Sequence, residues 1–179
     1  MRTTEGFVHL AVRNELKRRG WLLIAGQYPG GSDDECCALN ILDPVLARDR
    51  SPDPRRHSEN KLVPDLIALR GRYLLIIEMK PSFSAGDLKK LRTLLGERKP
   101  DLLMALERFA TERNCRDLLP VKSLRIVPAL GFSRKSHFSR ERDVCYFLVT
   151  SLEKVEVMPP LSICPDGESL DEVAARGRS

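Results

Sequence analysis

The feature that most constrains the fold is a pair of apolar runs joined by a very short turn, in the stretch KLVPDLIALRGRYLLIIEMK, residues 61–80. Gly71 stands between the runs, and a type II′ hairpin turn takes glycine at its first central position. With Gly71 and Arg72 as the central residues, Asp65 stands directly opposite Glu78 at the open end, with Cβ atoms about 5 Å apart. The stretch therefore predicts an antiparallel hairpin that brings two carboxylates together.

The segments on either side of the hairpin predict further strands and helices. Val8, Val12 and Leu16 recur every four residues, which is typical of one face of a helix. The expected helices span about 3–20, 84–97 and 101–113, and the expected strands span 21–28, 123–132, 144–151 and 154–158. This order predicts an α/β fold with a mixed central sheet flanked by helices.

Length and composition limit the class of protein. A chain of 179 residues favours one domain, which we place at 1–160, with an irregular insertion at about 29–60 and a polar, peripheral tail at 161–179. Hydrophobic residues at 42% and charged residues at 31% argue against a disordered chain and against a membrane-embedded one. Five cysteines without a C-x-x-C pair, and an N-terminus without secretory features, favour the reducing cytoplasm.

Three charged residues at the open end of the hairpin require a chemical explanation. Asp65 and Glu78 carry like charges, which repel when they face each other on a sheet. Alternation along the strand is expected to place Lys80 on the same face as Glu78. Mg²⁺ takes oxygen ligands and is often held by one or two carboxylates, while a lysine can bind a phosphate oxygen, stabilise developing charge, or help to orient and deprotonate water. The alternative is a structural ion pair, of Glu78 with Lys80 or of Asp65 with Lys61.

The pattern Pro64-Asp65, then Glu78-x-Lys80 at the end of the second strand, resembles the PD-(D/E)XK nuclease superfamily. The resemblance covers residues 5–97 approximately, and it implies a restriction-endonuclease-like fold with the core order αβββαβ. It further implies that Asp65, Glu78 and the Met79 carbonyl bind Mg²⁺, with Mn²⁺ as a substitute, and that Lys80 is catalytic.

Many members of that superfamily add an acidic residue from the first helix. In this chain Glu5 and His9 lie one turn apart on the predicted helix, so either side chain can point toward the metal. His9 occupies the place where the resolvases of the superfamily carry a glutamate, and a histidine there could carry protons or bind the metal. The alternatives are a carboxylate in the capping turn and a half-buried imidazole.

Positive charge gathers in two segments that could bind DNA. The net charge is +5, which is compatible with a polyanionic partner. One segment precedes the hairpin and includes Arg55 and Arg56. The other, between the later strands, includes Arg134, Lys135, Arg140 and Arg142 with the aromatic residues Phe132 and Phe138. Arginine and lysine bind phosphates, and arginine also reads guanine edges; the alternative is a pair of solvated loops.

Together these features predict a Mg²⁺-dependent endodeoxyribonuclease of a restriction, defence or mobile-element type. Symmetric cutting of both strands needs two active sites, which favours a homodimer. Three alternatives remain: a nuclease-fold DNA-binding or assembly subunit that needs a partner protein to cut, a junction-resolving or repair nuclease, and an RNA-directed enzyme.

Overall fold

The structure is a computed structural model that describes residues 3–27, 39, 62–164 and 168–176. Within these residues, six strands form one sheet in the order β1-β2-β3-β4-β5-β6. Strands β3, β4 and β5 run parallel to one another, and the other neighbouring pairs are antiparallel. The strands are β1 (Leu22–Gly26), β2 (Leu66–Arg70), β3 (Tyr73–Met79), β4 (Arg125–Ser133), β5 (Cys145–Val149) and β6 (Val155–Met158).

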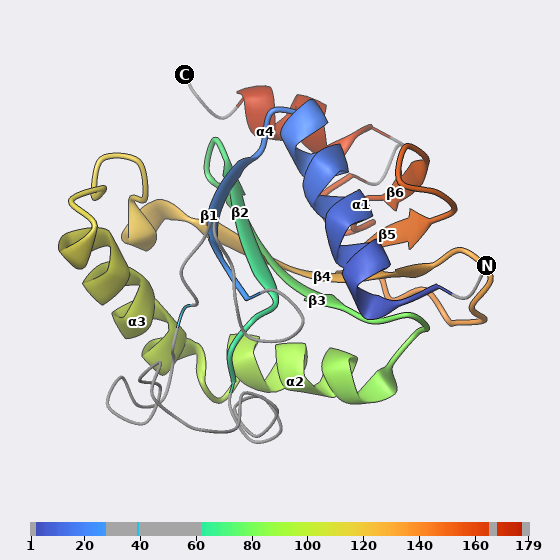
Figure 1. Cartoon of the computed structure of the whole chain (residues 1–179). Coiled ribbons are helices and arrows are strands. Elements are labelled where there is room, and N and C mark those ends of the chain that lie inside the picture. The colour runs from blue at the N-terminus through green and yellow to red at the C-terminus, as the bar shows by residue number, and fades with distance from the viewer. Residues whose placement is uncertain (1–2, 28–38, 40–61, 165–167, 177–179) are drawn as a thin grey trace.

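Helices cover both faces of this sheet (Figure 1). Helices α1 (Glu5–Arg18) and α4 (Leu170–Arg176) share one apolar core with the inward-facing side chains of the sheet. Helices α2 (Ala85–Leu95) and α3 (Lys99–Glu112) share a second core on the opposite face. The predicted α/β class, with a mixed sheet flanked by helices, is therefore confirmed. The expected insertion at about 29–60 lies outside the described residues except for Leu39.

The hairpin forms with the predicted register. Arg70 pairs with Tyr73 and Leu66 pairs with Ile77, so Asp65 and Glu78 are the next residues along. Gly71 has a φ of +57°, and among the described residues the only non-glycine with a positive φ is Asn114, which agrees with the predicted type II′ turn. The turn at Gly71 and Arg72 sets this register and therefore sets where the two carboxylates face each other.

Helix α1 packs closely on the carboxyl end of the sheet. Thr4 caps it by accepting a hydrogen bond from the Phe7 N–H at 3.2 Å. A Cβ at Gly131 of β4 would lie 2.9 Å from Met79 Cγ and 3.1 Å from Val12 Cγ2. Because Gly131 has no side chain, α1 can approach β3 and β4 closely, which brings its first turn to the end of β3.

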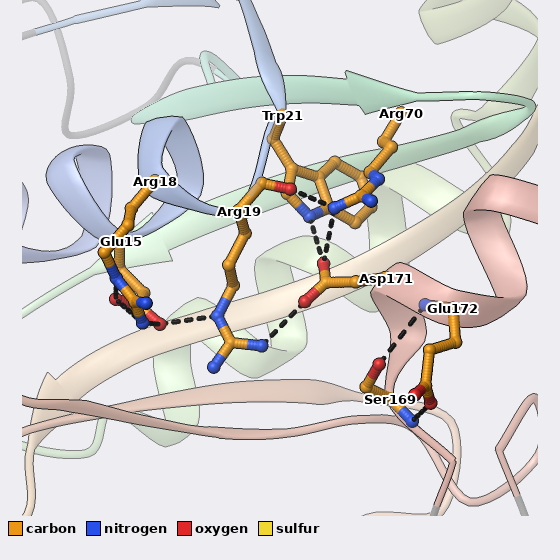
Figure 2. A network of polar contacts seen from close by, with 8 residues as sticks. All are labelled: Glu15, Arg18, Arg19, Trp21, Arg70, Ser169, Asp171 and Glu172. Carbon is orange, nitrogen blue, oxygen red and sulfur yellow. Dashed lines mark hydrogen bonds and ion pairs between the residues drawn. The ribbon is translucent and has the colours of Figure 1, made fainter.

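The C-terminal segment packs on the core instead of forming the peripheral polar tail that its composition suggests. Leu170 and Ala174 of α4 are buried, and a Cβ at Gly71 would collide with the Ala174 carbonyl oxygen. Asp171 of α4 links this helix to the segment between α1 and β1 (Figure 2). Its carboxylate accepts hydrogen bonds from Trp21 Nε1 and from Arg19, each at 2.7 Å.

The network around Asp171 extends through two further contacts (Figure 2). Arg70 lies 3.4 Å from the Asp171 carboxylate and donates to the Arg19 carbonyl. Arg19 also donates to the buried Glu15 at 2.5 Å. The network therefore ties α1, β1, β2 and α4 together on the face opposite α2 and α3.

Replacing Asp171 by alanine is expected to destabilise the fold by about 2–3 kcal/mol, because the Trp21 N–H and the Arg19 guanidinium would lose a partly buried acceptor. Chemical denaturation measures the change, with Glu153→Ala, in an exposed turn, as the matched control. An Asp171→Ala protein as stable as the control would mean that α4 does not depend on this network.

No helix within the described part of the chain is both long and apolar enough to cross a membrane.

Candidate active site

The candidate site lies where β3 and β4 end on the same side of the sheet. These strands are parallel and pair from Tyr73–Arg125 to Met79–Gly131, so their carboxyl ends meet at one edge. The Lys80 N–H continues the ladder by donating to the Gly131 carbonyl at 3.0 Å. Helix α2 begins shortly after this point, with Ser84 as its N-cap.

Asp65 occupies the centre of this edge. Its carboxylate accepts a hydrogen bond from the Met79 N–H at 2.7 Å. Burial raises the pKa of Asp65 to about 6, and the charge of Glu5 adds to this effect. The positive charges of Lys80 and Lys90 and the hydrogen bond from Met79 act in the opposite direction. The charges of Lys80 after β3, Glu5 of α1 and Lys90 of α2 therefore all act on Asp65.

Glu78 lies deeper than Asp65 and pairs with a residue from α2. It is buried, and Lys90 Nζ lies 2.7 Å from its Oε1. Lys90 also donates to the Val63 carbonyl at 2.7 Å. Burial and the neighbouring Asp65 charge raise the pKa of Glu78 to about 8, against the opposing effect of the Lys90 ammonium. Asp65 and Glu78 are therefore close enough to repel each other when both are ionised.

Lys80 turns toward α1. Its ammonium donates to Glu5 Oε1 at 2.7 Å, and both side chains are about one third exposed, at 37% and 34%. Burial lowers the pKa of Lys80, but the Glu5 hydrogen bond and the charge of Asp65 outweigh that effect and leave the pKa above its ordinary value. Lys80 is consequently an ammonium at neutral pH.

The partners of Glu78 and Lys80 lie on opposite faces of the sheet, which differs from the expectation that the two side chains share one face. Lys80 follows the last residue of β3, so strand alternation no longer fixes its direction, and it contacts Glu5 of α1. The expected structural pair of Glu78 with Lys80 is not the one found. The charge of Asp65 acts on both Glu78 and Lys80 and raises the pKa of each.

The two accessory candidates on α1 have different positions. Glu5 reaches the site through Lys80. His9, one turn later, is fully buried on the packed side of α1, and not half-buried as the alternative had it. Met79 holds Asp65 through its backbone N–H, and its own side chain is buried in the core shared with α1.

The donor set fits a hard divalent cation. Asp65 and Glu78 supply carboxylate oxygens, whose mutual repulsion and raised pKa values a cation would relieve. In the described part of the chain, no group of three or more His, Cys, Asp or Glu side chains is arranged to hold a metal. A metal at this site would therefore take the rest of its ligands from backbone oxygen, water or substrate.

The raised pKa values predict that the metal-free protein loses stability as the pH rises. In unfolded chains aspartate and glutamate have pKa values of about 4. Between about pH 4 and pH 8 the folded state therefore binds more protons at Asp65 and Glu78 than the unfolded state does. The stabilisation from protonated Asp65 and Glu78 is complete below this window and is lost as the pH passes about 6 and then about 8.

Melting temperatures in EDTA between about pH 5 and pH 8.5 measure this effect. Glu78→Gln is the matched variant, because it cannot ionise and should show a much shallower decline above about pH 6. A wild-type melting temperature that stays constant or rises across the window would contradict the buried-carboxylate description.

The basic segment after β4 is an ordered loop beside the site. Phe138 packs against Phe83, Phe132 and Tyr146, with ring centroids 5.9, 4.9 and 4.8 Å away. Phe83 follows Lys80 by three residues, so the loop is held next to the site. Both aromatic residues of this basic segment contribute to packing: Phe132 is buried in β4, and Phe138 is partly buried against the same core.

The four basic candidates of this loop differ in their contacts. Arg134 pairs with Glu156 at 2.8 Å, and Arg140 donates to the Pro159 carbonyl at 2.5 Å. Lys135 and Arg142 are exposed, and neither side chain forms an ion pair with another residue in the described ranges. Arg55 and Arg56 lie outside those ranges.

Sequence reasoning missed the role of two residues on α2. Lys90 pairs with Glu78, and the charge of Asp87 raises the pKa of both Glu78 and Lys80. Asp87 and Lys90 precede the buried Leu91 and Leu94 by four residues each. This spacing places Asp87 and Lys90 on the buried side of α2, so the sequence alone could have indicated that both side chains face the sheet.

Comparison with protein-family models, with curated proteins and with solved structures finds no match for this chain.

Proposed function

We propose that this protein is a divalent-metal-dependent endonuclease that hydrolyses DNA phosphodiester bonds. The observation that carries the proposal is the position of Asp65 at the carboxyl end of β3, where its carboxylate accepts a hydrogen bond from the Met79 N–H and its charge acts on both Glu78 and Lys80. The buried carboxylate of Glu78, the half-buried carboxylate of Asp65 and the Lys80 ammonium are groups suited to metal-assisted phosphodiester hydrolysis. The order α1-β1-β2-β3-α2-α3-β4 contains the αβββαβ order of the PD-(D/E)XK superfamily with one additional helix, α3, before β4, and we assign the fold to that superfamily as part of this proposal.

Each group of the site has a distinct part in the proposed reaction. Asp65 and Glu78 would hold Mg²⁺ or Mn²⁺, with the Met79 carbonyl as a further ligand, and the metal would supply Lewis-acid chemistry. Lys80 is an ammonium with a raised pKa, so it donates a hydrogen bond to a phosphate oxygen and stabilises the charge that develops there. That protonation state argues against Lys80 as the base that activates water.

Glu5 is a positioning residue in this scheme. It holds the Lys80 ammonium at 2.7 Å over the edge of the sheet, close to Asp65. Substrate phosphate would compete with Glu5 for the same ammonium. His9 is buried one turn further along α1 and would support the first turn of the helix from within.

DNA would approach along the loop that follows β4. Lys135 and Arg142 are exposed, so they can bind phosphates without first breaking an ion pair. Arg134 and Arg140 are held by Glu156 and by the Pro159 carbonyl, contacts that a phosphate could replace because exposed ion pairs contribute little stability. Arg55 and Arg56 remain DNA-binding candidates from the sequence.

One observation favours a second candidate function, in which a nuclease-fold subunit cuts only with a partner protein. Lys80 and Glu78 each have an ion-pair partner within the chain, Glu5 and Lys90, so the site groups are occupied before substrate arrives. A second copy of the chain in a homodimer, or a cytoplasmic partner protein, would then supply the further residues that the site needs to cut DNA. A restriction or defence role and a junction-resolving or repair role share the same chemistry.

Incubation of the purified protein with supercoiled plasmid, linear DNA, branched DNA and RNA tests the proposal. We expect cleavage of DNA in Mg²⁺ or Mn²⁺ and none in EDTA. Mapped ends at fixed positions would indicate a recognition sequence. Binding of DNA without nicking under every condition would favour the partner-dependent subunit, and neither binding nor cleavage would contradict both candidates.

A further inference from the structure

Lys90 places a positive charge where the proposed metal would bind. Its ammonium lies 2.7 Å from Glu78 Oε1 and donates to the Val63 carbonyl at 2.7 Å, and the side chain is 20% exposed. Mg²⁺ approaches carboxylate oxygens to about 2.1 Å. An ammonium and a divalent cation on the same carboxylate oxygen repel each other, so metal binding to Oε1 favours movement of Lys90 away from Glu78.

Asp87 offers a new partner for a displaced Lys90. Both residues lie on α2 and are three positions apart, a spacing that places side chains next to each other on a helix. The Asp87 Oδ2 atom is buried and has no hydrogen-bond partner among the described residues. The Asp87 charge also acts on Glu78, so its carboxylate lies close to the site. A lysine stem is long and flexible enough to move between such neighbours.

The charges of the site agree with such an exchange. Four carboxylates lie within electrostatic reach of one another together with two ammonium groups, which gives a formal charge of −2 when all are ionised; the six residues are Glu5, Asp65, Glu78, Lys80, Asp87 and Lys90. One divalent cation neutralises this charge, provided that Lys90 leaves Glu78 and still has a carboxylate nearby.

We propose that Lys90 is a resident counter-ion of Glu78, that a divalent metal displaces it, and that Asp87 accepts it. This inference rests on the proposed metal site. In the metal-free protein Lys90 keeps the buried Glu78 paired, and in the metal-bound protein it pairs with Asp87. Asp87 and Lys90 are therefore positioning residues that adjust metal affinity without contacting the metal.

A double-mutant cycle on Mn²⁺ affinity tests the exchange. The dissociation constant for Mn²⁺ alone is measured by electron paramagnetic resonance, without DNA, for the wild type, Asp87→Asn, Lys90→Met and the double variant. We expect Asp87→Asn to weaken Mn²⁺ binding by about tenfold in the wild type, because Lys90 loses its acceptor, and by less than about twofold when Lys90 is already absent. Lys89→Met, at the exposed neighbouring position, should bind Mn²⁺ like the wild type.

The outcomes separate this inference from the proposed function. An equal effect of Asp87→Asn in both backgrounds would overturn the exchange, since Asp87 would then act on the metal directly. A wild type that binds no Mn²⁺ would remove both the exchange and the metal site. If the Lys90 variants do not fold, a Mg²⁺-loaded structure of the wild type decides: Lys90 Nζ within about 3 Å of the Asp87 carboxylate supports the exchange, and Lys90 still on Glu78 overturns it.

Discussion

Replacing Lys80 by methionine is expected to reduce DNA cleavage by about a thousandfold or more, because the ammonium that stabilises the developing phosphate charge would be lost. Methionine has a similar length and no charge, and Lys80 is one third exposed with Glu5 as its ion-pair partner. The fold should therefore be retained. Single-turnover cleavage at saturating Mg²⁺ measures the effect, and circular dichroism verifies the fold.

Lys89→Met is the matched control for this variant, since Lys89 is exposed on α2 and the same charge is removed. It should cleave at nearly the wild-type rate. A Lys80→Met protein that cleaves as fast as this control would show that Lys80 takes no part in the reaction.

Replacing Asp65 by asparagine is expected to abolish metal-dependent cleavage, with a loss of about a thousandfold or more, because a neutral amide is a much weaker ligand for Mg²⁺ than a carboxylate. The Asn side-chain oxygen can still accept the hydrogen bond that Asp65 receives from Met79 at 2.7 Å. The local geometry should therefore survive.

Stability gives a second readout for Asp65→Asn. Because burial raises the pKa of Asp65 to about 6, its ionised form is unfavourable at about pH 8, and the asparagine variant should melt at the same temperature or higher in EDTA. Asp143→Asn, at an exposed position, should change neither cleavage nor melting temperature. Loss of cleavage together with a large loss of stability would mean that Asp65 is a structural residue.

The hairpin could be predicted from the sequence because its determinants are local. Gly71 marks the two-residue turn between two apolar runs, and the turn type and loop length set the register of the hairpin. The pairing of Leu66 with Ile77 therefore followed from the chain itself, and with it the approach of Asp65 to Glu78. Helix α1 could also be predicted from a local signal, because the buried Val8, Val12 and Leu16 recur every four residues.

The contacts that could not be predicted join residues far apart in the sequence. Nothing near Glu78 indicates that Lys90 will pair with it, because that contact depends on how α2 docks against the sheet. Asp171 belongs to a polar segment, and its bonds to Arg19 and Trp21 span almost the whole chain. Phe138 lies among basic residues, whose composition suggested an exposed loop, but it packs against three other aromatic rings.

The direction of Lys80 shows where strand alternation stops being informative. Residues up to Met79 follow the pleat of β3, and their faces could be assigned by counting. Lys80 is outside the strand and has a flexible stem, so its contact with Glu5 depends on the position of α1. The residue types of the site could be predicted from the sequence, whereas their pairing could not.

The most direct measurement is anomalous X-ray scattering from crystals of the protein soaked in Mn²⁺. We predict an anomalous peak at about 2.0–2.3 Å from carboxylate oxygens of both Asp65 and Glu78, and loss of that peak in the Asp65→Asn variant. Crystals that show Mn²⁺ only at other places, or none between these two carboxylates, would contradict the metal site on which the proposed nuclease depends.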